Sequence, residues 1–386
     1  MPLSRALPST TASMVTHDRP SRRDDFQIAI ICALPLEYDA ASLLVDHFWD
    51  QDGKQYGRAP GDTNTYRNGR IGKYDVVLML LPNIGKAAVA GSAASLRTSY
   101  PSLKLAFLVG ICGGVPSSGA GEALLGDVVI GEAIIQHDFG RQYPGRFVPK
   151  ETVEGNLGGP TKDIRSLIAY LRTEPGKKDL RQNAAKHLKA LQDTAVNRHY
   201  QCNYRYPGFA EDKLFAATYR HKHRGPRSCG FCNGKTEDFC DMAARATCAE
   251  LHCDESQLVP RKRLEWKRDL KPEDAQCPEI FIGRIASGDT VMKSGEHRDQ
   301  IAKQQSVIAF EMEGAGAWDE IPCIAVKGIC DYADSHKHKA WQPFAAATAA
   351  AVMRAVLERY TLTDNPESAT RSTGKRFQPS GLEFPC

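Results

Sequence analysis

The sequence contains no long hydrophobic run and carries little net charge. No apolar stretch reaches the roughly 18 residues that a membrane-spanning helix needs, and residues 1–25 lack the apolar core of a secretory signal. The formal net charge is only +4 over 386 residues, which does not by itself indicate a nucleic-acid partner. We therefore expect a cytoplasmic protein with neither a membrane nor a nucleic-acid partner.

Cysteine is plentiful but unevenly placed. Six of the twelve cysteines lie within 202–253, and without a secretory signal we interpret them as thiols or metal ligands, not as a disulfide framework. Cys229 and Cys232 have the spacing of half a zinc knuckle, and Cys248 and Cys253 are the expected second pair. We predict a structural zinc here, with reduced thiols on a mobile lid as the alternative; other candidate ligands are His221, His223, His252 and Cys240.

Short apolar stretches of β type alternate with segments of helical spacing in two parts of the chain. Predicted strands lie at 26–34, 74–82, 104–116, 126–138, 279–292 and 321–334, and predicted helices at 35–48, 86–100 and 344–360. This alternation indicates a three-layer α/β fold with a largely parallel sheet.

The stretch 151–278 differs from the rest of the chain. It is rich in Lys, Arg, His and Cys and has few apolar runs, so we interpret it as an insertion or lid within a single domain that spans 26–360. The polar segments 1–25 and 361–386 are predicted to be disordered.

Three acidic residues follow predicted strands. Glu37 comes just after the first strand, Glu313 follows a short apolar run, and Asp331 lies near the end of the strand at 321–334. Ligands in open α/β sheets bind at the carboxyl ends of strands. Together with the glycine-rich turn GICGG at 110–114, the three acids predict a polar pocket at one edge of the sheet. The alternative for each is a carboxylate that a helix dipole stabilises.

The motifs that carry these residues occur in a recognisable order: IAIICALPLEYDAA, NIGKAAVAGSAASL, VGICGGVP, GDVVIG, IASGDTVM, AFEMEGAGAW and AVKGICDYAD. This series resembles the purine nucleoside phosphorylase/uridine phosphorylase superfamily over about 26–150 and 279–360. It is most similar to the methylthioadenosine/adenosylhomocysteine nucleosidase branch, in the form found at the N-terminus of fungal NLR-type receptors. The resemblance implies a three-layer α/β/α fold with a central mixed sheet, a homo-oligomer, and catalysis without a cofactor.

The resemblance also implies roles for the acidic residues. In such nucleosidases the glutamate of the Met-Glu motif accepts hydrogen bonds from the ribose hydroxyls, which here is Glu313, with Met312 packing under the sugar. Asp331 falls where the family keeps the acid that protonates N7 of the departing purine, and Glu37 matches the glutamate that deprotonates the attacking water. Glu311 is expected to bind nearby backbone groups.

The remaining substrate contacts are expected from three segments. Gly113 lies in the glycine-rich turn, Ser287 and Asp289 are placed to orient the base, and Val291 and Met292 either stack against it or pack in the core. Cations that could meet a 5′ phosphate are Arg141, Lys86, Arg146, Lys293, His336 and Lys337. The expected substrate is a purine nucleoside or nucleotide, with adenosine, AMP and ATP as the candidates.

Hydrolysis and phosphorolysis remain alternative reactions at this stage. Bacterial-type phosphorylases of this family place an arginine and a serine where this chain has Leu108 and Ile111, and phosphate needs such fixed cations. This difference and the presence of Glu37 favour hydrolysis, although Ile111 also replaces a small polar residue that helps nucleosidases to hold the water. A non-catalytic nucleoside-binding or signalling module is the third alternative, and the presence of all three acids argues against it.

Overall fold

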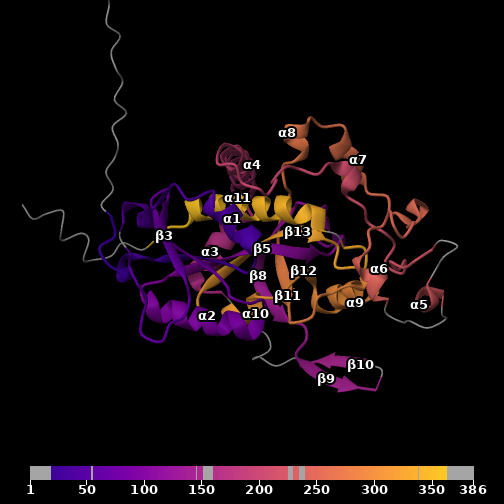
Figure 1. Ribbon diagram of the computed structural model, residues 1–386, viewed down its shortest axis with the longest axis horizontal. Coiled ribbons are helices and arrows are strands. Elements are labelled where there is room, and N and C mark those ends of the chain that lie inside the picture. The colour runs from indigo at the N-terminus through magenta and orange to yellow at the C-terminus, as the bar shows by residue number, and fades with distance from the viewer. Residues whose placement is uncertain are drawn as a thin grey trace, which may run out of the picture.

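The computed structural model describes residues 19–53, 55–144, 146–150, 160–224, 229–233, 240–337 and 339–362, with a nine-stranded sheet at their centre (Figure 1). The order of the strands across the sheet is β12-β11-β8-β13-β5-β1-β4-β3-β2. Their bounds are β1 (Ile28–Cys32), β2 (His47–Phe48), β3 (Tyr66–Ile71), β4 (Tyr74–Leu80), β5 (Leu105–Gly114), β8 (Val128–Gln136), β11 (Ile280–Ser287), β12 (Val307–Glu311) and β13 (Cys323–Asp331).

The sheet is mixed, and part of it closes on itself. β1, β4, β5 and β13 run parallel to their neighbours in the centre, whereas β13 is antiparallel to β8 and β3 is antiparallel to β4. β12 pairs in parallel with β11 and antiparallel with β5 through Ala309–Gly114 and Phe310–Gly113. Strands β5, β12, β11, β8 and β13 therefore form a closed ring, with β5 in contact with three neighbours.

Helices cover both faces of the sheet, as the three-layer expectation requires (Figure 1). One face carries α1 (Pro35–Ser42) and α11 (Gln342–Arg359), and the other carries α2 (Lys86–Ser99) and α10 (Gly314–Ala317). Small residues allow the close packing of α11 on the sheet: a side chain on Gly328 of β13 would overlap the Ala345 carbonyl. None of the described helices is both long and apolar enough to cross a membrane.

Several predicted elements have different ends in the structure. The predicted helix at 35–48 stops at Ser42, because the chain turns through hydrogen bonds from Leu44 to Ala41 and from Val45 to Ser42, and then pairs as β2. β3 was not expected from the sequence.

Two small hairpins lie outside the sheet. One pairs β6 (Ser117–Ser118) with β7 (Gly121–Glu122), and the other pairs β9 (Gly140–Tyr143) with β10 (Arg146–Pro149). The β9–β10 hairpin projects from the body (Figure 1).

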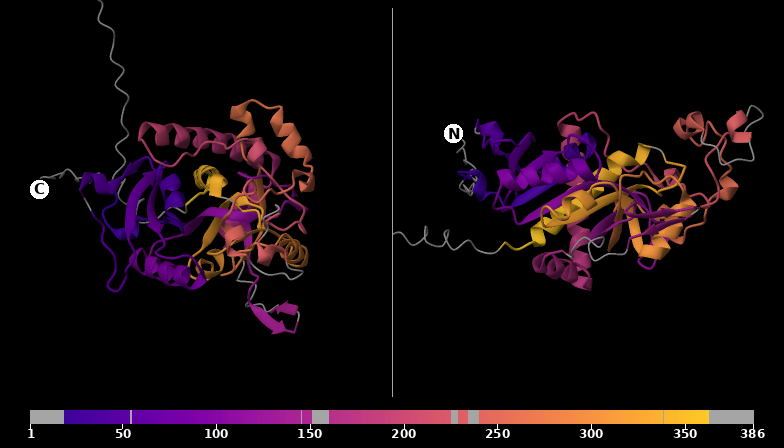
Figure 2. Two further views of the ribbon diagram at one scale, coloured as in Figure 1. Left: turned by 45° about the vertical axis from the view of Figure 1, so that its right-hand side comes forward. Right: turned by 90° about the horizontal axis from the view of Figure 1, so that it is seen from below.

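The predicted insertion divides into two parts. α3 (Lys162–Leu171) and α4 (Glu174–Asn197) contribute buried side chains to the main hydrophobic core, and α4 packs against α11. Where it is described, the second part contains short helices, α5 (Gly230–Asn233), α6 (Asp241–Arg245), α7 (Lys262–Arg268) and α8 (Pro272–Ala275), before α9 (Gly295–Gln305) follows β11. α5 and α6 lie at the end of the molecule opposite to β3 (Figure 1, Figure 2).

Parts of the predicted disordered ends can be compared with the structure. Residues 19–25 are described and include a short 3-10 helix, Arg23–Asp25, and Arg19 donates a hydrogen bond to the Trp49 carbonyl at 2.8 Å. The first 18 residues and those after Leu362 lie outside the described residues.

Candidate active site

The carboxyl end of β5 is the centre of the candidate site. In the register of the sheet, Gly110 lies beside Lys327 of β13, and Gly113 lies beside Asp331 of the same strand. β12 pairs with this end of β5, and β1 pairs with its other edge before the chain enters α1, which carries Glu37. Three separate segments therefore bring the predicted acids to one stretch of β5, about 10 Å long between Gly110 and Gly113.

Glu37 is buried in the first turn of α1 and is 2% exposed. Its Oε2 accepts the N–H groups of Ala33 and Leu34, both at 2.9 Å, and its Oε1 accepts the N–H of Ile111 at 2.8 Å. A side chain on Gly110 would overlap this carboxylate, which explains the glycine. Burial raises the pKa of Glu37, while a nearby lysine and the three N–H donors oppose that rise. A fixed carboxylate with a raised pKa is suited to accept a proton.

Lys327, in the middle of β13, joins Glu311 and Glu313. Its Nζ lies 2.7 Å from Glu313 Oε2 and 3.2 Å from Glu311 Oε2, and the lysine is 2% exposed. Glu311 also accepts the backbone N–H groups of Glu313 and Gly314, each at 3.0 Å, which is the backbone contact expected from the sequence. These bonds fix both glutamates at the junction of β12 and α10.

Three carboxylates share this one lysine, and burial penalises their charges. Burial raises the pKa of Glu313 to about 7; Lys327 lowers it, and the charges of Glu311 and Glu37 raise it. Burial also raises the pKa of Glu311, but the charge of Lys327 and several hydrogen bonds outweigh this, so that its pKa is lowered. Glu311 is thus the constant counter-charge of Lys327, and Glu313 gains or loses a proton near neutral pH.

Asp331 ends β13 beside the glycines of β5. Its Oδ1 accepts the Ala333 N–H at 2.8 Å and lies 3.0 Å from Lys337 Nζ, and its Oδ2 accepts the Cys330 S–H at 3.4 Å. Ala333 has a φ of 52°, a left-handed conformation that strains a residue with a side chain. A Cβ on Gly113 would lie 2.9 Å from Asp331 Oδ1, so this glycine allows the carboxylate to lie against β5.

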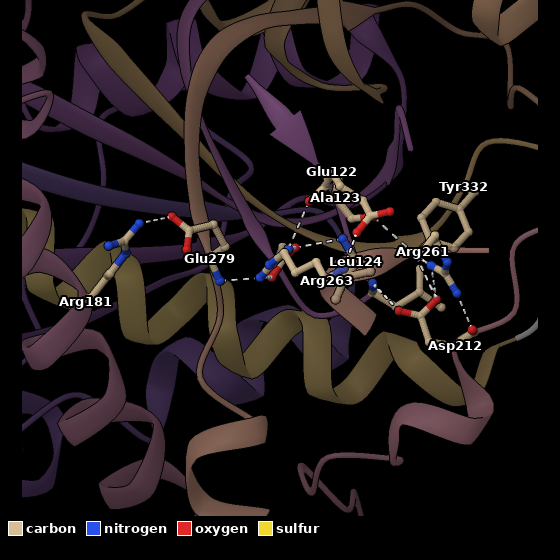
Figure 3. Close-up of polar contacts among 11 residues, drawn as sticks. Glu122, Ala123, Leu124, Arg181, Asp212, Arg261, Arg263, Glu279 and Tyr332 are labelled. Carbon is tan, nitrogen blue, oxygen red and sulfur yellow. Dashed lines mark hydrogen bonds and ion pairs between the residues drawn. The ribbon is translucent and has the colours of Figure 1, made fainter. Parts of the chain in front are cut away.

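The residue after Asp331 is held by a buried ion pair from the second part of the insertion (Figure 3). The Tyr332 hydroxyl donates to Asp212 Oδ1 at 2.7 Å, and Arg261 Nη1 lies 2.7 Å from the same oxygen. The Arg261 and Asp212 side chains are 4% and 1% exposed. Either charge would be costly at this depth without its partner, so the pair stays together. Because Tyr332 donates to Asp212, the pair also holds Tyr332 and the end of β13 in one position.

Comparison with known proteins agrees with this architecture. Residues 27–205 match the family model of the phosphorylase superfamily. This stretch of the chain is therefore similar to the phosphorylase superfamily. This confirms the resemblance that the motif series indicated, and the match extends over α3 and α4.

A nucleotide-binding leucine-rich repeat (NLR)-like protein of Hyaloscypha variabilis is 30% identical over 346 residues, which are 88% of this chain. The chain spans about 30% of the length of that relative. Among solved structures, the futalosine hydrolase of Helicobacter pylori is 16% identical with a TM-score of 0.46, and covers 86% of this chain and 98% of its own. The 5′-methylthioadenosine/S-adenosylhomocysteine nucleosidase of Neisseria meningitidis is 16% identical with a TM-score of 0.47, with the same shares covered.

The residues predicted to contact the base bind other parts of the chain. The Ser287 hydroxyl is fully buried and accepts the Ala315 N–H at 2.9 Å. Asp289 Oδ1 accepts the backbone N–H of Lys86 at 2.8 Å, and Lys86 Nζ lies 2.6 Å from Asp138 Oδ1. Ser287 thus contacts α10, and Asp289 contacts the start of α2.

The apolar candidates separate into buried and exposed positions. Met292 packs against a buried cluster that includes Ala333 of the strained turn, and Met312 is half-buried between the two glutamates of its motif. Val291 is 49% exposed, and Arg141 is exposed on the projecting β9–β10 hairpin (Figure 1). Met312 therefore lies between two of the acids and Met292 packs in the core, whereas Val291 and Arg141 are at the surface.

The cations considered for a 5′ phosphate have varied surroundings. Lys86 and Lys337 contact carboxylates, at Asp138 and Asp331 respectively. Lys293 is exposed and His336 is buried. The side chain of Arg146 lies outside the described residues.

The four cysteines predicted as one zinc site lie in two groups. Cys229 and Cys232 lie with His223 and Cys240, whereas Cys253 lies with His221 and His336. Cys248 also belongs to the second group, because its Sγ is 3.8 Å from His221 Nδ1. The sequence indicated Cys240, His221 and His223 as alternative ligands, but it indicated neither His336 nor the division of the ligands between two groups.

Sequence reasoning missed Lys327. Its signal was present, since a lysine inside the apolar stretch CIAVKGIC is as costly to bury as Glu311 or Glu313 and needs a partner of opposite charge. The contact of Lys337 with Asp331 was also missed, because a lysine six residues after the acid has no fixed geometry relative to it until the turn is known.

Proposed function

We propose that this chain hydrolyses the N-glycosidic bond of an adenine nucleoside or nucleotide, with adenosine, AMP and ATP as the substrates to test. The observation that carries the proposal is Glu37. It is a buried carboxylate with a raised pKa, held by three backbone N–H groups at the carboxyl end of the sheet. The match of residues 27–205 to the phosphorylase superfamily supports a nucleoside as the substrate class.

The reaction needs a proton removed at one end and a proton supplied at the other. Water attacks the anomeric carbon and loses a proton to Glu37, while the bond from that carbon to the base nitrogen breaks and its electron pair leaves with the base. Asp331 protonates the purine at N7, so that the base leaves as a neutral molecule. A positioned acid or base of this kind accelerates such a reaction by roughly 10²–10⁴-fold.

Glu313 is proposed to bind the ribose. Its carboxylate accepts hydrogen bonds from both hydroxyls of the cis-diol, since a charged acceptor binds two donors strongly. Lys327 and Glu311 hold it in place at the junction of β12 and α10. The diol favours the ionised form of Glu313, whose pKa of about 7 makes this change accessible at neutral pH.

The contacts of Lys327 support hydrolysis over phosphorolysis. A phosphate nucleophile needs a cation to bind it, but Lys327 Nζ is already within 3.2 Å of two glutamates. Leu108 is 1% exposed, and the Ile111 N–H is bound to Glu37. A phosphate at this end of β5 would also meet the Glu37 carboxylate.

Lys337 is proposed to hold the side chain of Asp331 in place. Its ammonium group lies 3.0 Å from Asp331 Oδ1 and is 20% exposed. Asp331 regains its proton from solvent after each turnover.

We also propose that the enzyme acts as a homo-oligomer. Exposed aromatic residues on or beside the projecting β9–β10 hairpin, Phe139, Tyr143 and Phe147, are 39–49% exposed and support a protein contact there. Light scattering of the purified chain measures its molar mass. A monomer at all concentrations contradicts this part of the proposal.

The activity is tested by incubating the purified chain with adenosine, AMP and ATP, with and without inorganic phosphate. In phosphate-free buffer, chromatography should show free adenine and a sugar product whose anomeric hydroxyl carries no phosphate. Glu37→Gln should abolish base release, whereas Asp39→Asn, on the same helix and partly exposed, should retain it. Release that depends on phosphate and yields ribose 1-phosphate would make the enzyme a phosphorylase, and binding without release would make it a non-catalytic module.

A further inference from the structure

Four side chains at α5 and α6 surround one point. His223 Nδ1 lies 3.3 Å from Cys232 Sγ, 3.6 Å from Cys229 Sγ and 3.8 Å from Cys240 Sγ, and the sulfurs of Cys229 and Cys240 are 3.6 Å apart. The ligand atoms of all four residues lie within 4.8 Å of one another. We call this group the first cluster.

These distances match the edges of a zinc tetrahedron. With Zn–S and Zn–N bonds of ordinary length, two sulfur ligands lie about 3.8 Å apart and a sulfur and a nitrogen about 3.6 Å apart. Thiols are weak hydrogen-bond donors and gain little by converging on a single imidazole nitrogen. Coordination of one cation gives a physical reason for the arrangement.

A second group lies between α6 and the segment that follows β13. His221 Nδ1 is 3.4 Å from Cys253 Sγ and 3.8 Å from Cys248 Sγ. The other ring nitrogen of His221, Nε2, is 2.9 Å from the Ala246 carbonyl. That hydrogen bond puts the proton on Nε2 and leaves the Nδ1 lone pair facing the two sulfurs, which is how a metal-binding histidine is held.

His336 completes this second cluster. A ring nitrogen of His336 lies within 4.8 Å of a ring nitrogen of His221 and of Cys253 Sγ. The ring is 7% exposed, its Nδ1 lies 3.9 Å from Asp334 Oδ1, and its buried Nε2 has no hydrogen-bond partner among the described residues. A buried polar atom without a partner is costly, and a metal ion would satisfy it.

The surrounding segment has little else to stabilise it. Within the described residues, the hydrophobic cluster at this place has only three buried members, Cys232, Ala243 and Leu251. Segments without a sufficient core commonly depend on a metal for folding.

We propose that residues 221–253, together with His336, bind two zinc ions. One is held by His223, Cys229, Cys232 and Cys240, and the other by His221, Cys248, Cys253 and His336. The second ion joins the insertion to the segment after β13, one residue before Lys337, the partner of Asp331. The proposal does not depend on the enzymatic activity.

Metal analysis tests both sites on the full-length protein, purified without chelator from zinc-supplemented cells. We expect about two zinc ions per chain. Cys232→Ser should lose one, Cys253→Ser should lose the other, and Cys277→Ser, at a half-buried cysteine outside both clusters, should retain two. Fewer than two ions in the unchanged protein, or two ions in Cys232→Ser or Cys253→Ser, would refute the proposal.

Cobalt substitution keeps the test decisive if a serine variant does not fold. In the unchanged protein, Co²⁺ should give tetrahedral d–d bands and thiolate charge-transfer absorption, with three thiolates on one ion and two on the other. Octahedral spectra, or a disulfide between Cys229 and Cys240 found by mass spectrometry, would contradict the assignment.

Discussion

Within the described residues, the acid cluster of Glu37, Glu311, Glu313 and Lys327 lies in the largest hydrophobic core, whereas the Cys/His segment 221–253 has almost no core of its own. The strands beside the acid cluster are fully buried over most of their length, and backbone N–H groups hold two of its carboxylates. The described part of the Cys/His segment buries only three residues in its own cluster. The fold itself preorganises the acids, while the second region needs a ligand to hold its side chains together.

The two regions also balance charge in different ways. The acid cluster has three carboxylates and one lysine, so a proton on Glu313 reduces its excess of negative charge. The Cys/His segment has thiols and imidazoles. These groups are stable so close together when a cation binds them, with the cysteines as thiolates. The first arrangement is suited to proton transfer, and the second is suited to a structural metal.

Among the further substitutions that follow, the largest effect is expected at Asp331. Asp331→Asn keeps the shape of the side chain but cannot deliver a proton, so turnover should fall by roughly 10²–10⁴-fold while substrate still binds. Chromatographic base release gives turnover, and calorimetry gives affinity. Asp319→Asn, at an exposed site, is the control; turnover near that of the unchanged protein in Asp331→Asn would place the proton donor elsewhere.

A loss of stability is expected at Lys327. Lys327→Met leaves Glu311 and Glu313 buried without their counter-charge, which should lower the free energy of unfolding by about 3–5 kcal/mol. Urea denaturation measures this, with Lys303→Met on the surface of α9 as control. Adding Glu311→Gln to Lys327→Met should restore part of the loss, and no change in Lys327→Met would mean that the ion pair is not formed.

A pH dependence is expected from Glu313. Its pKa rises from 4.5 to about 7 on folding, so kcat/KM should increase about tenfold per pH unit below 7 and level off above it. Because the folded state binds this proton more tightly, its contribution to stability is full below pH 4.5 and is lost as the pH rises toward 7. Glu313→Gln should remove both effects, and a profile unchanged in this variant would assign the proton to another group.

The smallest effect tests whether the two regions are independent. Among the described residues, no ligand of the first cluster contacts Glu37 or Glu313, and the effects of mutations at separate sites usually add within about 0.5 kcal/mol. Cys232→Ser should therefore change base release by about twofold or less, although proteolysis should cut the 221–253 segment faster. A larger loss of activity would show that the two regions are coupled.

The sequence by itself indicated much of the fold and the positions of the acids. Apolar strands followed by helices are local patterns, so β1, β4, β5, β8, β11 and β13 could be located from them, and Glu37 and Asp331 could be assigned to strand ends. The end of α1 at Ser42 and the strand β3 could not be located in this way. Residues 43–48 have helical apolar spacing, but the pairing of β2 with β3 overrides it.

Only the tertiary structure decided which groups are partners. The closure of β12 on β5, the contact of Lys327 with two glutamates and the division of the cysteines between two clusters all join residues that local patterns do not relate. His336 is far from Cys253 in sequence, and Asp212 is far from Tyr332. Sequence spacing lists candidate ligands, but the geometry that selects among them exists only after the long-range strands have paired.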